Sequence, residues 1–109
     1  MNPVLIYITV SNREEAIYIS HELLQKKLIS CANIVDNVTS IYNWQGEIQT
    51  SKEAILMVKT FASHSVRAIN VIKTSHSYQC PAIVTLPIND GNHEYIEWMR
   101  KQLTNELSL

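Results

Sequence analysis

The 109-residue chain contains only two glycines and three prolines, the residues that most often interrupt regular structure. It also contains only two cysteines. Two cysteines, Cys31 and Cys80, are too few for a disulfide framework, so free thiols are expected. The two glycines, Gly46 and Gly91, lie far apart, so no glycine-rich loop is available to cradle a phosphate group. Low-complexity segments and repeats of fixed period are also absent from the sequence. The length and composition fit one domain over residues 1–109.

No charge of one sign dominates, because 9 basic side chains are balanced by 10 acidic ones and the isoelectric point is near 6.4. This balance argues against the basic face of a nucleic-acid-binding protein. The first ten residues, MNPVLIYITV, contain neither a charged leader nor an apolar run long enough to span a bilayer. They are interpreted as a first strand. The protein is therefore expected in the cytoplasm, without nucleic-acid or membrane partners.

Residues 40–60, SIYNWQGEIQTSKEAILMVKT, predict one long β-hairpin that turns at Gln45 and Gly46. Its two halves, 30–44 and 47–61, have about 15 residues each, which at about 3.3 Å per residue gives a length of about 45–50 Å. A compact globule of this chain length is only about 34 Å across. The end of the hairpin must therefore project. Its Tyr42, Trp44 and Ile48 side chains need a cover, and the simplest cover is another copy of the chain.

The rest of the chain predicts two further strands and three helices. Residues 4–10 and 82–88 are apolar on both alternating sets, which is typical of strands buried on two faces. Ser11 and Glu14 predict a capping box at the start of the first helix, and Ser63 is the expected cap of the second. The last helix is expected over about 93–103. The predicted apolar stripes of the three helices are Ala16, Ile19, Ser20, Leu23 and Leu24, then Val66, Ile69 and Ile72, then Ile96, Met99 and Leu103.

The predicted order of elements is β-α-β-β-α-β-α. With right-handed crossovers, this order gives an α+β fold: a ferredoxin-like βαββαβ antiparallel sheet with the first and third strands central. The third helix is an addition at the C-terminal side, and the long hairpin projects from the sheet.

Several motifs, taken together, resemble the CutA divalent-cation-tolerance family. The block SIYNWQG at 40–46 is followed seven residues later by an acid at Glu53, and then by Lys59-Thr60. The likeness covers nearly the whole chain, and its specificity comes from the combination. The remaining matches are Cys31-Ala32-Asn33-Ile34, His76-x-Tyr78-x-x-Pro81, Leu86-Pro87-Ile88 and the 95–98 segment of the last helix.

The resemblance implies a PII-like homotrimer in which the hairpins of three ferredoxin-like subunits complete one another's sheets. It also implies that a copper ion or another divalent cation is bound, in a binding or signalling role and not an enzymatic one, with no organic cofactor. The chain departs from the family pattern in one loop, where Ser77 replaces a proline and Gln79 and Ala82 replace acids. Without these carboxylates, a metal site in the loop is expected to suit copper or zinc better than Mg²⁺ or Ca²⁺.

Three side chains are candidate metal ligands: Cys31, His76 and Cys80. A thiolate at Cys31 would suit copper or zinc, although a cysteine often packs as a small hydrophobic residue. Cys80 follows His76 by four residues in a loop, so both could face one ion, although this spacing is a weak signal. His76 closes the second helix, and a helix C-cap without a ligand is the alternative for it.

The expected ligand cleft between copies is lined by Tyr42, Trp44, Glu53, Lys59, His76 and Tyr78. Tyr42 and Trp44 share one face of the hairpin, where they would either stack on a ligand or pack against another copy. Glu53 and Lys59 also share a face but are too far apart to pair directly. Lys59 would bind an anion or form an ion pair between chains.

Three other functions are compatible with the same fold class. A small acylphosphatase-like enzyme needs an arginine and a cradle of amides after the first strand; Arg13 lies there, but residues 9–13 include no glycine. A ferredoxin-like RNA-binding module needs a basic-glycine-aromatic pattern on the third strand, which reads SKEAILMVKTF. A trimeric scaffold for partner proteins, without a ligand, is the third alternative, and the sequence leaves it open.

Overall fold

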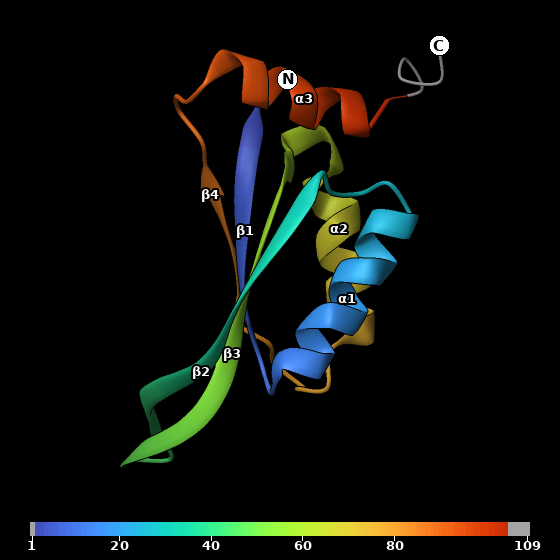
Figure 1. Cartoon of the computed structure of the whole chain (residues 1–109). Coiled ribbons are helices and arrows are strands. Elements are labelled where there is room, and N and C mark those ends of the chain that lie inside the picture. The colour runs from blue at the N-terminus through green and yellow to red at the C-terminus, as the bar shows by residue number, and fades with distance from the viewer. Residues whose placement is uncertain (1, 105–109) are drawn as a thin grey trace.

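The computed structural model describes residues 2–104, and its elements follow the predicted order. The strands are β1 (Pro3–Val10), β2 (Cys31–Trp44), β3 (Glu47–Phe61) and β4 (Ile83–Pro87), and the helices are α1 (Arg13–Gln25), α2 (Ala62–Ser75) and α3 (His93–Gln102). The strands form an antiparallel sheet in the order β2-β3-β1-β4, so β1 and β3 are central, as predicted. Helices α1 and α2 cover one face of this sheet, and α3 crosses its end (Figure 1). The ferredoxin-like α+β prediction is confirmed.

The core lies between the sheet and the helices α1 and α2. Side chains alternate across a strand, so every second residue of β1, from Val4 to Val10, faces the helices and is buried. Ala54, Leu56 and Val58 of β3 are fully buried on the same face. The helices contribute Ala16, Ile19, Leu23, Ala68 and Ile72.

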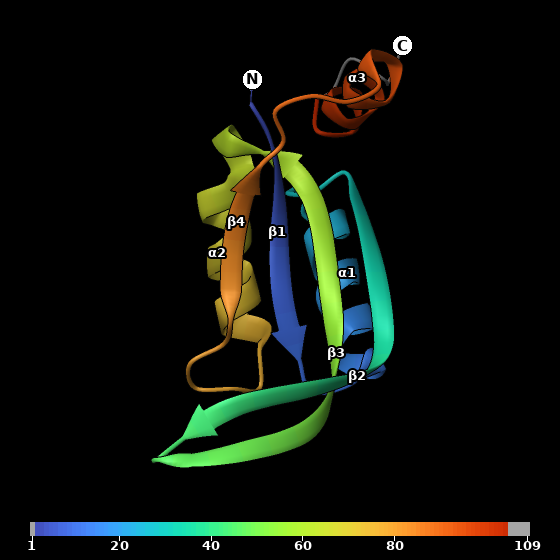
Figure 2. The same ribbon diagram turned by 90° about the vertical axis from the view of Figure 1, so that its left-hand side faces the viewer.

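β2 and β3 form the long hairpin that the sequence predicts. The turn residues Gln45 and Gly46 have φ angles of 50° and 83°, the left-handed conformation that a tight two-residue hairpin turn requires. The principal extents of the chain are 54 × 26 × 22 Å, and its radius of gyration is 15.0 Å. A compact chain of this length has a radius of gyration of about 13 Å. The hairpin therefore projects beyond the body of the molecule (Figure 2).

The projecting part of the hairpin begins at a β-bulge in β2. Val35 pairs with Ile55. The next regular pair joins Val38 to Glu53, so β2 has one residue more than β3 between these two pairs. Asn37 lies in the bulge with a φ of 57°. An extra residue bends a strand, which explains why the hairpin beyond the bulge swings across the end of the sheet in Figure 2. We call this projecting part, residues 38–53, the arm.

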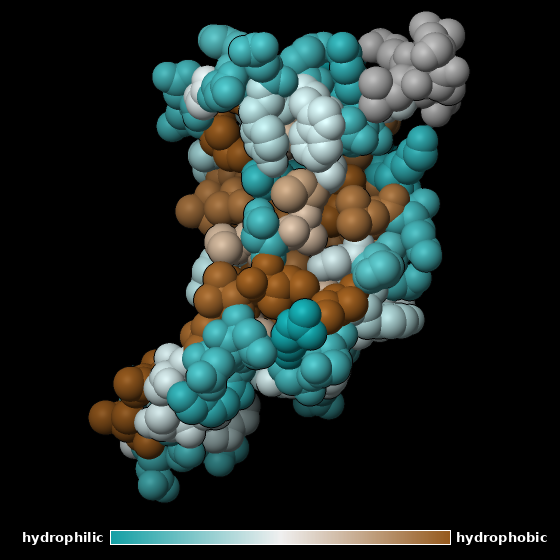
Figure 3. All heavy atoms as spheres, in the orientation of Figure 1, coloured by the Kyte–Doolittle hydropathy of each residue, from teal (hydrophilic) through white to brown (hydrophobic). Residues whose placement is uncertain are grey.

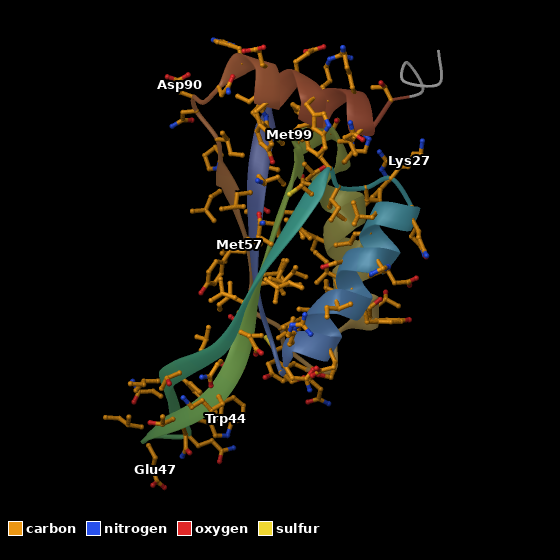
Figure 4. The ribbon with its side chains drawn as sticks, viewed as in Figure 1. Lys27, Trp44, Glu47, Met57, Asp90 and Met99 are labelled. Carbon is orange, nitrogen blue, oxygen red and sulfur yellow. The ribbon has the colours of Figure 1, made fainter. Side chains whose placement is uncertain are left out.

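Within residues 2–104, no helix covers the middle of the sheet face opposite α1 and α2, which carries apolar side chains from all four strands. Their alternation places them on one side of the sheet, and Figure 4 shows Met57 on the side away from the helices. Four of the five are exposed, Met57 being half-buried, and Figure 3 shows hydrophobic surface along the sheet and at the end of the arm. We call these five residues the open face: Tyr7, Val35, Met57, Val84 and Leu86.

The start of α1 differs from the prediction by one residue. Asn12, and not Ser11, is the N-cap, and its Oδ1 accepts a hydrogen bond of 2.8 Å from the Glu15 amide. Glu15 accepts in return from the amide and hydroxyl of Ser11. The predicted pair of Ser11 and Glu14 is wrong because Asn12 and Glu15 have the same three-residue spacing and Asn12 takes the N-cap position. Glu15 reaches back to the amide of Ser11 and not to that of the N-cap, so a reciprocal capping box is not formed.

The start of α2 also differs. The helix follows β3 directly, with Phe61 as N-cap and no hydrogen bond from a capping side chain. Ser63, the predicted cap, lies inside the first turn, and its hydroxyl is 2.8 Å from Nδ1 of His64. The strand delivers the chain to the helix without a loop, so no position outside the helix is left for Ser63 to act as a cap.

Four predictions of burial are wrong. β1 is buried only on its face toward the helices, because Tyr7 on its other face is exposed. Leu24 and Val66 are exposed, because α1 and α2 reach the core through other positions of their turns, such as Leu23 and Ala68. β4 is not buried on two faces. It is an edge strand whose residues from Val84 onward are exposed, and half of its apolar side chains belong to the open face. The second apolar set of β4, which suggested burial on two faces, is therefore a surface that one chain leaves uncovered.

Candidate functional site

The structure divides the predicted cleft residues between two ends of the sheet. In the register of β1 and β3, Lys59 lies opposite Leu5, whereas Thr9, which His76 contacts, lies opposite Ile55. These positions are four residues apart along the strand, or about 13 Å. Lys59 is therefore separated from His76 and Tyr78, and Trp44 lies farther out, at the end of the arm (Figure 4). A single chain does not form the predicted cleft as one continuous surface.

Five residues around the 76–78 loop form the first group, which we call the Tyr78 cluster. His76 anchors it, with a side chain that is 0% exposed. The Tyr78 amide can only donate, so Nδ1 of His76 must accept their 3.1 Å hydrogen bond. Nε2 of His76 then carries the proton and donates to the Thr9 carbonyl at 2.7 Å. The members of the cluster are Glu15, Glu53, His76, Ser77 and Tyr78.

Glu15 holds the same loop from the start of α1. Its Oε2 accepts from the Ser77 amide at 2.7 Å, and its Oε1 accepts from the amide and hydroxyl of Ser11. Burial alone would raise the pKa of the Glu15 carboxyl, but these hydrogen bonds from Ser11 and Ser77 lower its pKa to about 2. Glu15 is thus a stable carboxylate, and it lies 4.0 Å from Nδ1 of His76.

Tyr78 joins the loop to the arm. Its hydroxyl donates a 2.6 Å hydrogen bond to Oε2 of Glu53. Glu53 is the β3 residue in the first pair on the arm side of the bulge. Burial, and then the hydrogen bond and negative charge of Glu53, raise the pKa of Tyr78 well above its usual range. The Tyr78 ring also packs against His76, with ring centroids 4.8 Å apart. Tyr42 lies on the same face of the arm, and its hydroxyl is 3.2 Å from that of Ser51.

The second group, at the other end of the sheet, is the Lys59 cluster: Cys31, Lys59, Tyr95 and Trp98. Nζ of Lys59 lies 4.8 Å from the centroid of the Tyr95 ring, which stacks on Trp98 at 5.5 Å. A hydrogen bond to Tyr95 raises the pKa of Lys59, although burial opposes the shift. Cys31 is the strand partner of Lys59 in β2. This arrangement keeps Lys59 positively charged beside two partly exposed aromatic rings.

Sequence reasoning missed the partners that hold these two groups in place. The sequence pattern gives Glu15 and Thr9 no role in a site, names Ser77 only as a departure from the family pattern, and includes Tyr95 only in the 95–98 segment of the last helix. The spacing of Asn12 and Glu15 is an available signal for Glu15. The contact between Lys59 and Tyr95 depends on where α3 crosses the sheet, which no local pattern specifies.

The three predicted metal ligands do not converge in one chain. Cys31 belongs to the Lys59 cluster, whereas His76 belongs to the Tyr78 cluster. Cys80 is exposed, and both ring nitrogens of the buried His76 are already hydrogen bonded. Within residues 2–104, no group of three or more His, Cys, Asp or Glu side chains is arranged to hold a metal ion. The residues of a single chain therefore do not fit a metal site at the predicted positions.

A shallow pocket of about 470 Å³ lies elsewhere, between the start of β1, the end of β4 and α3. Its lining combines apolar and polar residues. It contains none of the predicted cleft residues, so it does not support the predicted site. The lining includes Asn2, Val4, Pro87, Asp90, His93 and Ile96.

Comparison with known proteins gives close relatives along most of the chain. The divalent-cation tolerance protein CutA of Thermus thermophilus is 41% identical over 97 residues, which cover 89% of this chain and 94% of that protein. The chloroplastic protein CutA of Arabidopsis thaliana is 33% identical over 102 residues, or 94% of this chain. The chain spans 56% of the length of that plant relative. The crystal structure of the divalent ion tolerance protein CutA1 from Ehrlichia chaffeensis matches with a TM-score of 0.90 and 38% identity, covering 94% of this chain and 96% of that one.

The names of the relatives overturn the expected cytoplasmic location. The Arabidopsis relative is named chloroplastic. A solved structure from Archaeoglobus fulgidus, with 34% identity and a TM-score of 0.90 over 94% of this chain and 99% of that one, is that of a periplasmic CutA. The prediction was wrong because the residues at the start of the chain specify a strand, and a strand carries no information about the compartment. Among the described residues, no helix is long and apolar enough to cross a membrane.

The family resemblance itself is confirmed. The model of the family described as CutA1 divalent ion tolerance protein matches residues 4–102. The matched segment contains all the strands from Val4 onward, the arm, the Tyr78 cluster and the Lys59 cluster. Together with the identities above, this match shows that the chain belongs to the CutA1 divalent ion tolerance family.

Proposed function

We propose that this chain forms a homotrimer that binds a metal ion or a small ligand and acts in divalent-cation tolerance, and that it is not an enzyme. Its ligand clefts lie between copies. The observation that carries the proposal is the exposed apolar surface that one chain leaves uncovered. On the arm, Ile41, Trp44 and Ile48 are 69%, 62% and 75% exposed. Large side chains of this kind, gathered on a projecting hairpin, are typical of a surface that another protein covers.

The open face supports assembly in the same way. Its Tyr7, Val35, Val84 and Leu86 are exposed on a sheet that α1 and α2 cover from the other side only. An antiparallel sheet that faces water normally carries polar residues on that side. An apolar face that extends over four strands therefore favours contact with other copies of the chain, and a ring of copies buries the face of every member.

A ring of copies also accounts for the separation of the predicted cleft residues. The Tyr78 cluster and the Lys59 cluster lie about 13 Å or more apart in one chain. A cleft that contains Glu53 or Tyr78 from one copy and Lys59 from the next requires no movement within either chain. We infer that the arm residues Tyr42 and Trp44 complete such a cleft, and that a small anionic or aromatic ligand would suit it, because Lys59 supplies a positive charge beside aromatic rings.

A divalent cation would have to draw its ligands from more than one copy. The thiol of Cys31 is a donor suited to copper or zinc, and the carboxylate of Glu53 is a second donor type. His76 is less suited to the role, because Thr9 and Tyr78 already occupy its two ring nitrogens. The bound metal would supply a charged cross-link between copies. Copper or zinc is thus proposed at the interface and not in the 76–82 loop.

Binding, and not catalysis, is favoured by the character of the clusters. Arg13, which an acylphosphatase-like mechanism would use, is an exposed residue at the start of α1. The nearby carboxylate of Glu15 would repel a phosphate group, since its pKa of about 2 keeps it charged.

The assembly is tested by sedimentation equilibrium of Trp44→Ser and Ile48→Ser chains. Both variants are expected to lose the trimeric mass that the unmodified chain shows, because each replaces an apolar contact by a polar side chain. Tyr18→Ser is the matched control, since Tyr18 is an exposed aromatic residue on the helical side of the molecule. If all three variants keep the same mass as the unmodified chain, the arm is not part of the interface.

The metal proposal is tested by calorimetric titration of the assembled protein with copper or zinc. Saturable heat that is lost in Cys31→Ser and kept in Cys80→Ser is the expected result, because Cys31 lies beside the open face and Cys80 lies in an exposed loop. No heat, or heat that neither substitution changes, would contradict the metal part of the proposal and leave the assembly to be judged by its own test.

A further inference from the structure

We propose that the loop of residues 76–78 is a clamp that fixes the direction of the arm, and that Tyr78 is its positioning residue. The effect on assembly rests on the proposed function, whereas the effect on the arm concerns one chain alone. The arm leaves the sheet at a point where its own backbone pairing gives it little support.

The arm needs an external support because the bulge separates it from the rest of the sheet. On the body side of the bulge, β3 lies between β2 and β1. Toward the arm, the last pair that joins β3 to β1 is Val10 with Ala54. Beyond that point β2 and β3 continue as a two-stranded ribbon. Two-stranded ribbons twist strongly and are only marginally stable in water. The direction of such a ribbon is therefore weakly determined by its own hydrogen bonds.

Tyr78 contacts the arm at the position where a support is most effective. Glu53 is the last arm residue of β3 along the chain, and it is followed by Ala54, the residue at which the pairing of β3 with β1 begins. The 2.6 Å hydrogen bond from Tyr78 to Glu53 therefore acts on the base of the arm. A hydrogen bond to a carboxylate is shorter and about twice as strong as one between neutral groups.

The clamp itself is held on the body by two contacts. The Ser77 amide donates to Glu15 at 2.7 Å, and Nε2 of His76 donates to the Thr9 carbonyl at 2.7 Å. Glu15 and Thr9 lie at the start of α1 and the end of β1, beside residues of the buried core. A third hydrogen bond, from the Tyr78 amide to Nδ1 of His76 at 3.1 Å, lies within the loop. The Tyr78 hydroxyl is thus fixed relative to the core, and its hydrogen bond to Glu53 fixes the base of the arm relative to the core.

A fixed arm favours assembly by pre-organisation. The apparent dissociation constant of a complex rises in inverse proportion to the fraction of molecules that hold the binding conformation. If loss of the Tyr78 hydroxyl leaves about a tenth of the arms in the correct direction, the apparent dissociation constant rises about tenfold. Tyr78 would therefore influence association through the direction of the arm.

The direct test measures the arm within one chain. Spin labels are placed on Glu47→Cys at the hairpin turn and on Asn70→Cys on the exposed side of α2, in chains with Cys31→Ser and Cys80→Ser. These chains also carry Ile48→Ser, which is expected to prevent assembly, so that no other copy holds the arm. Pulsed electron resonance then gives the distribution of distances between the labels. Tyr78→Phe is expected to broaden or shift this distribution, because it removes only the hydroxyl that reaches Glu53.

Tyr42→Phe is the matched control, because it removes a tyrosine hydroxyl from the same region whose partner, Ser51, lies within the arm. It is expected to leave the distribution unchanged. Glu53→Gln keeps a carbonyl acceptor and is expected to give an intermediate result, which guards against a folding defect in the other variants. An unchanged distribution in Tyr78→Phe would overturn the clamp.

Sedimentation equilibrium of the same variants, in unlabelled chains without Ile48→Ser, separates the two proposals. A broader distribution of label distances together with about a tenfold weaker association supports the clamp and its role in assembly. A broader distribution with unchanged association refutes the role in assembly. An unmodified chain that is monomeric refutes the proposed function, and the distance measurement still decides whether the clamp exists.

Discussion

His76 connects the end of β1 to the loop that follows α2, because its Nε2 donates a 2.7 Å hydrogen bond to the carbonyl oxygen of Thr9. Sequence spacing makes this histidine the most attractive metal ligand of the chain. Its surroundings give it another role, since its side chain is fully buried and its second nitrogen accepts from the Tyr78 amide. A buried side chain with both polar atoms satisfied stabilises the fold and is not free to bind an ion.

Replacement of His76 by alanine is therefore expected to destabilise the protein. The variant leaves the Thr9 carbonyl and the Tyr78 amide without their partner, which at about 1–3 kcal/mol for each unsatisfied group predicts a loss of about 2–6 kcal/mol. Urea unfolding measures the change. His93→Ala, at an exposed position at the start of α3, is the control and is expected to change stability by less than about 0.5 kcal/mol. Equal stabilities of the two variants would show that His76 is not a structural residue.

Replacement of Glu15 by glutamine is expected to give a pH-dependent loss of stability. The folded-state pKa of about 2 lies below the ordinary value of 4.5, so the charged carboxylate contributes stability above pH 4.5. This contribution fades as the pH falls from 4.5 to 2, because over this range the unfolded state takes up a proton that the folded state does not yet bind.

Near neutral pH, we expect Glu15→Gln to cost about 1–2 kcal/mol, since the amide keeps only part of the hydrogen bonding from Ser11 and Ser77. Unfolding curves from about pH 7 to about pH 2.5 follow the difference between the two proteins. A difference that stays constant over this range would mean that Glu15 has an ordinary pKa. Glu14→Gln, at an exposed neighbouring position, is the control.

α3 is expected to depend on one buried hydroxyl. Oγ of Ser30 donates a 2.7 Å hydrogen bond to the carbonyl of Met99, and this contact joins α3 to the residue before β2. Ser30→Ala leaves a buried carbonyl of the helix unsatisfied, which predicts a loss of about 1–2 kcal/mol and faster amide exchange in α3. Hydrogen exchange resolved by residue measures the effect. Uniform exchange changes over the whole chain would contradict a local attachment.

The hairpin turn is expected to tolerate alanine poorly. Gly46 has a φ of 83°, a conformation that a side chain disfavours, although a Cβ added there would meet no atom within 4 Å. Gly46→Ala should therefore cost about 1 kcal/mol through backbone strain alone. Gly91→Ala is the matched control, since its Cβ would only meet Ile96 at an ordinary contact distance of 3.4 Å. A similar cost at both positions would contradict the explanation by backbone conformation.

Much of the fold was accessible from the sequence because periodicity and turn chemistry are local. The alternation in β1 and β3, and the Gln45-Gly46 turn, place the strands to within a residue of where they lie. The exceptions have physical causes. Asn12 competes successfully with Ser11 for the start of α1, and β4 resembles a central strand because one of its apolar sets belongs to the open face.

The site was less accessible, because its contacts join residues far apart in the chain. Tyr78 and Glu53 are 25 residues apart, and His76 and Thr9 are 67 apart. The sequence indicates Glu53, His76 and Tyr78 as one set, and the structure brings these three together. Nothing local indicates that Lys59 lies at the other end of the sheet with Tyr95, because that depends on the register of β3 against β1 and on the crossing of α3.

The molecular mass of the unmodified protein in solution tests the central claim most directly. Multi-angle light scattering at micromolar concentrations is expected to return three times the 12.5 kDa mass of the chain, because the arm and the open face are covered only when copies meet. A particle of 12.5 kDa under the same conditions would contradict the account.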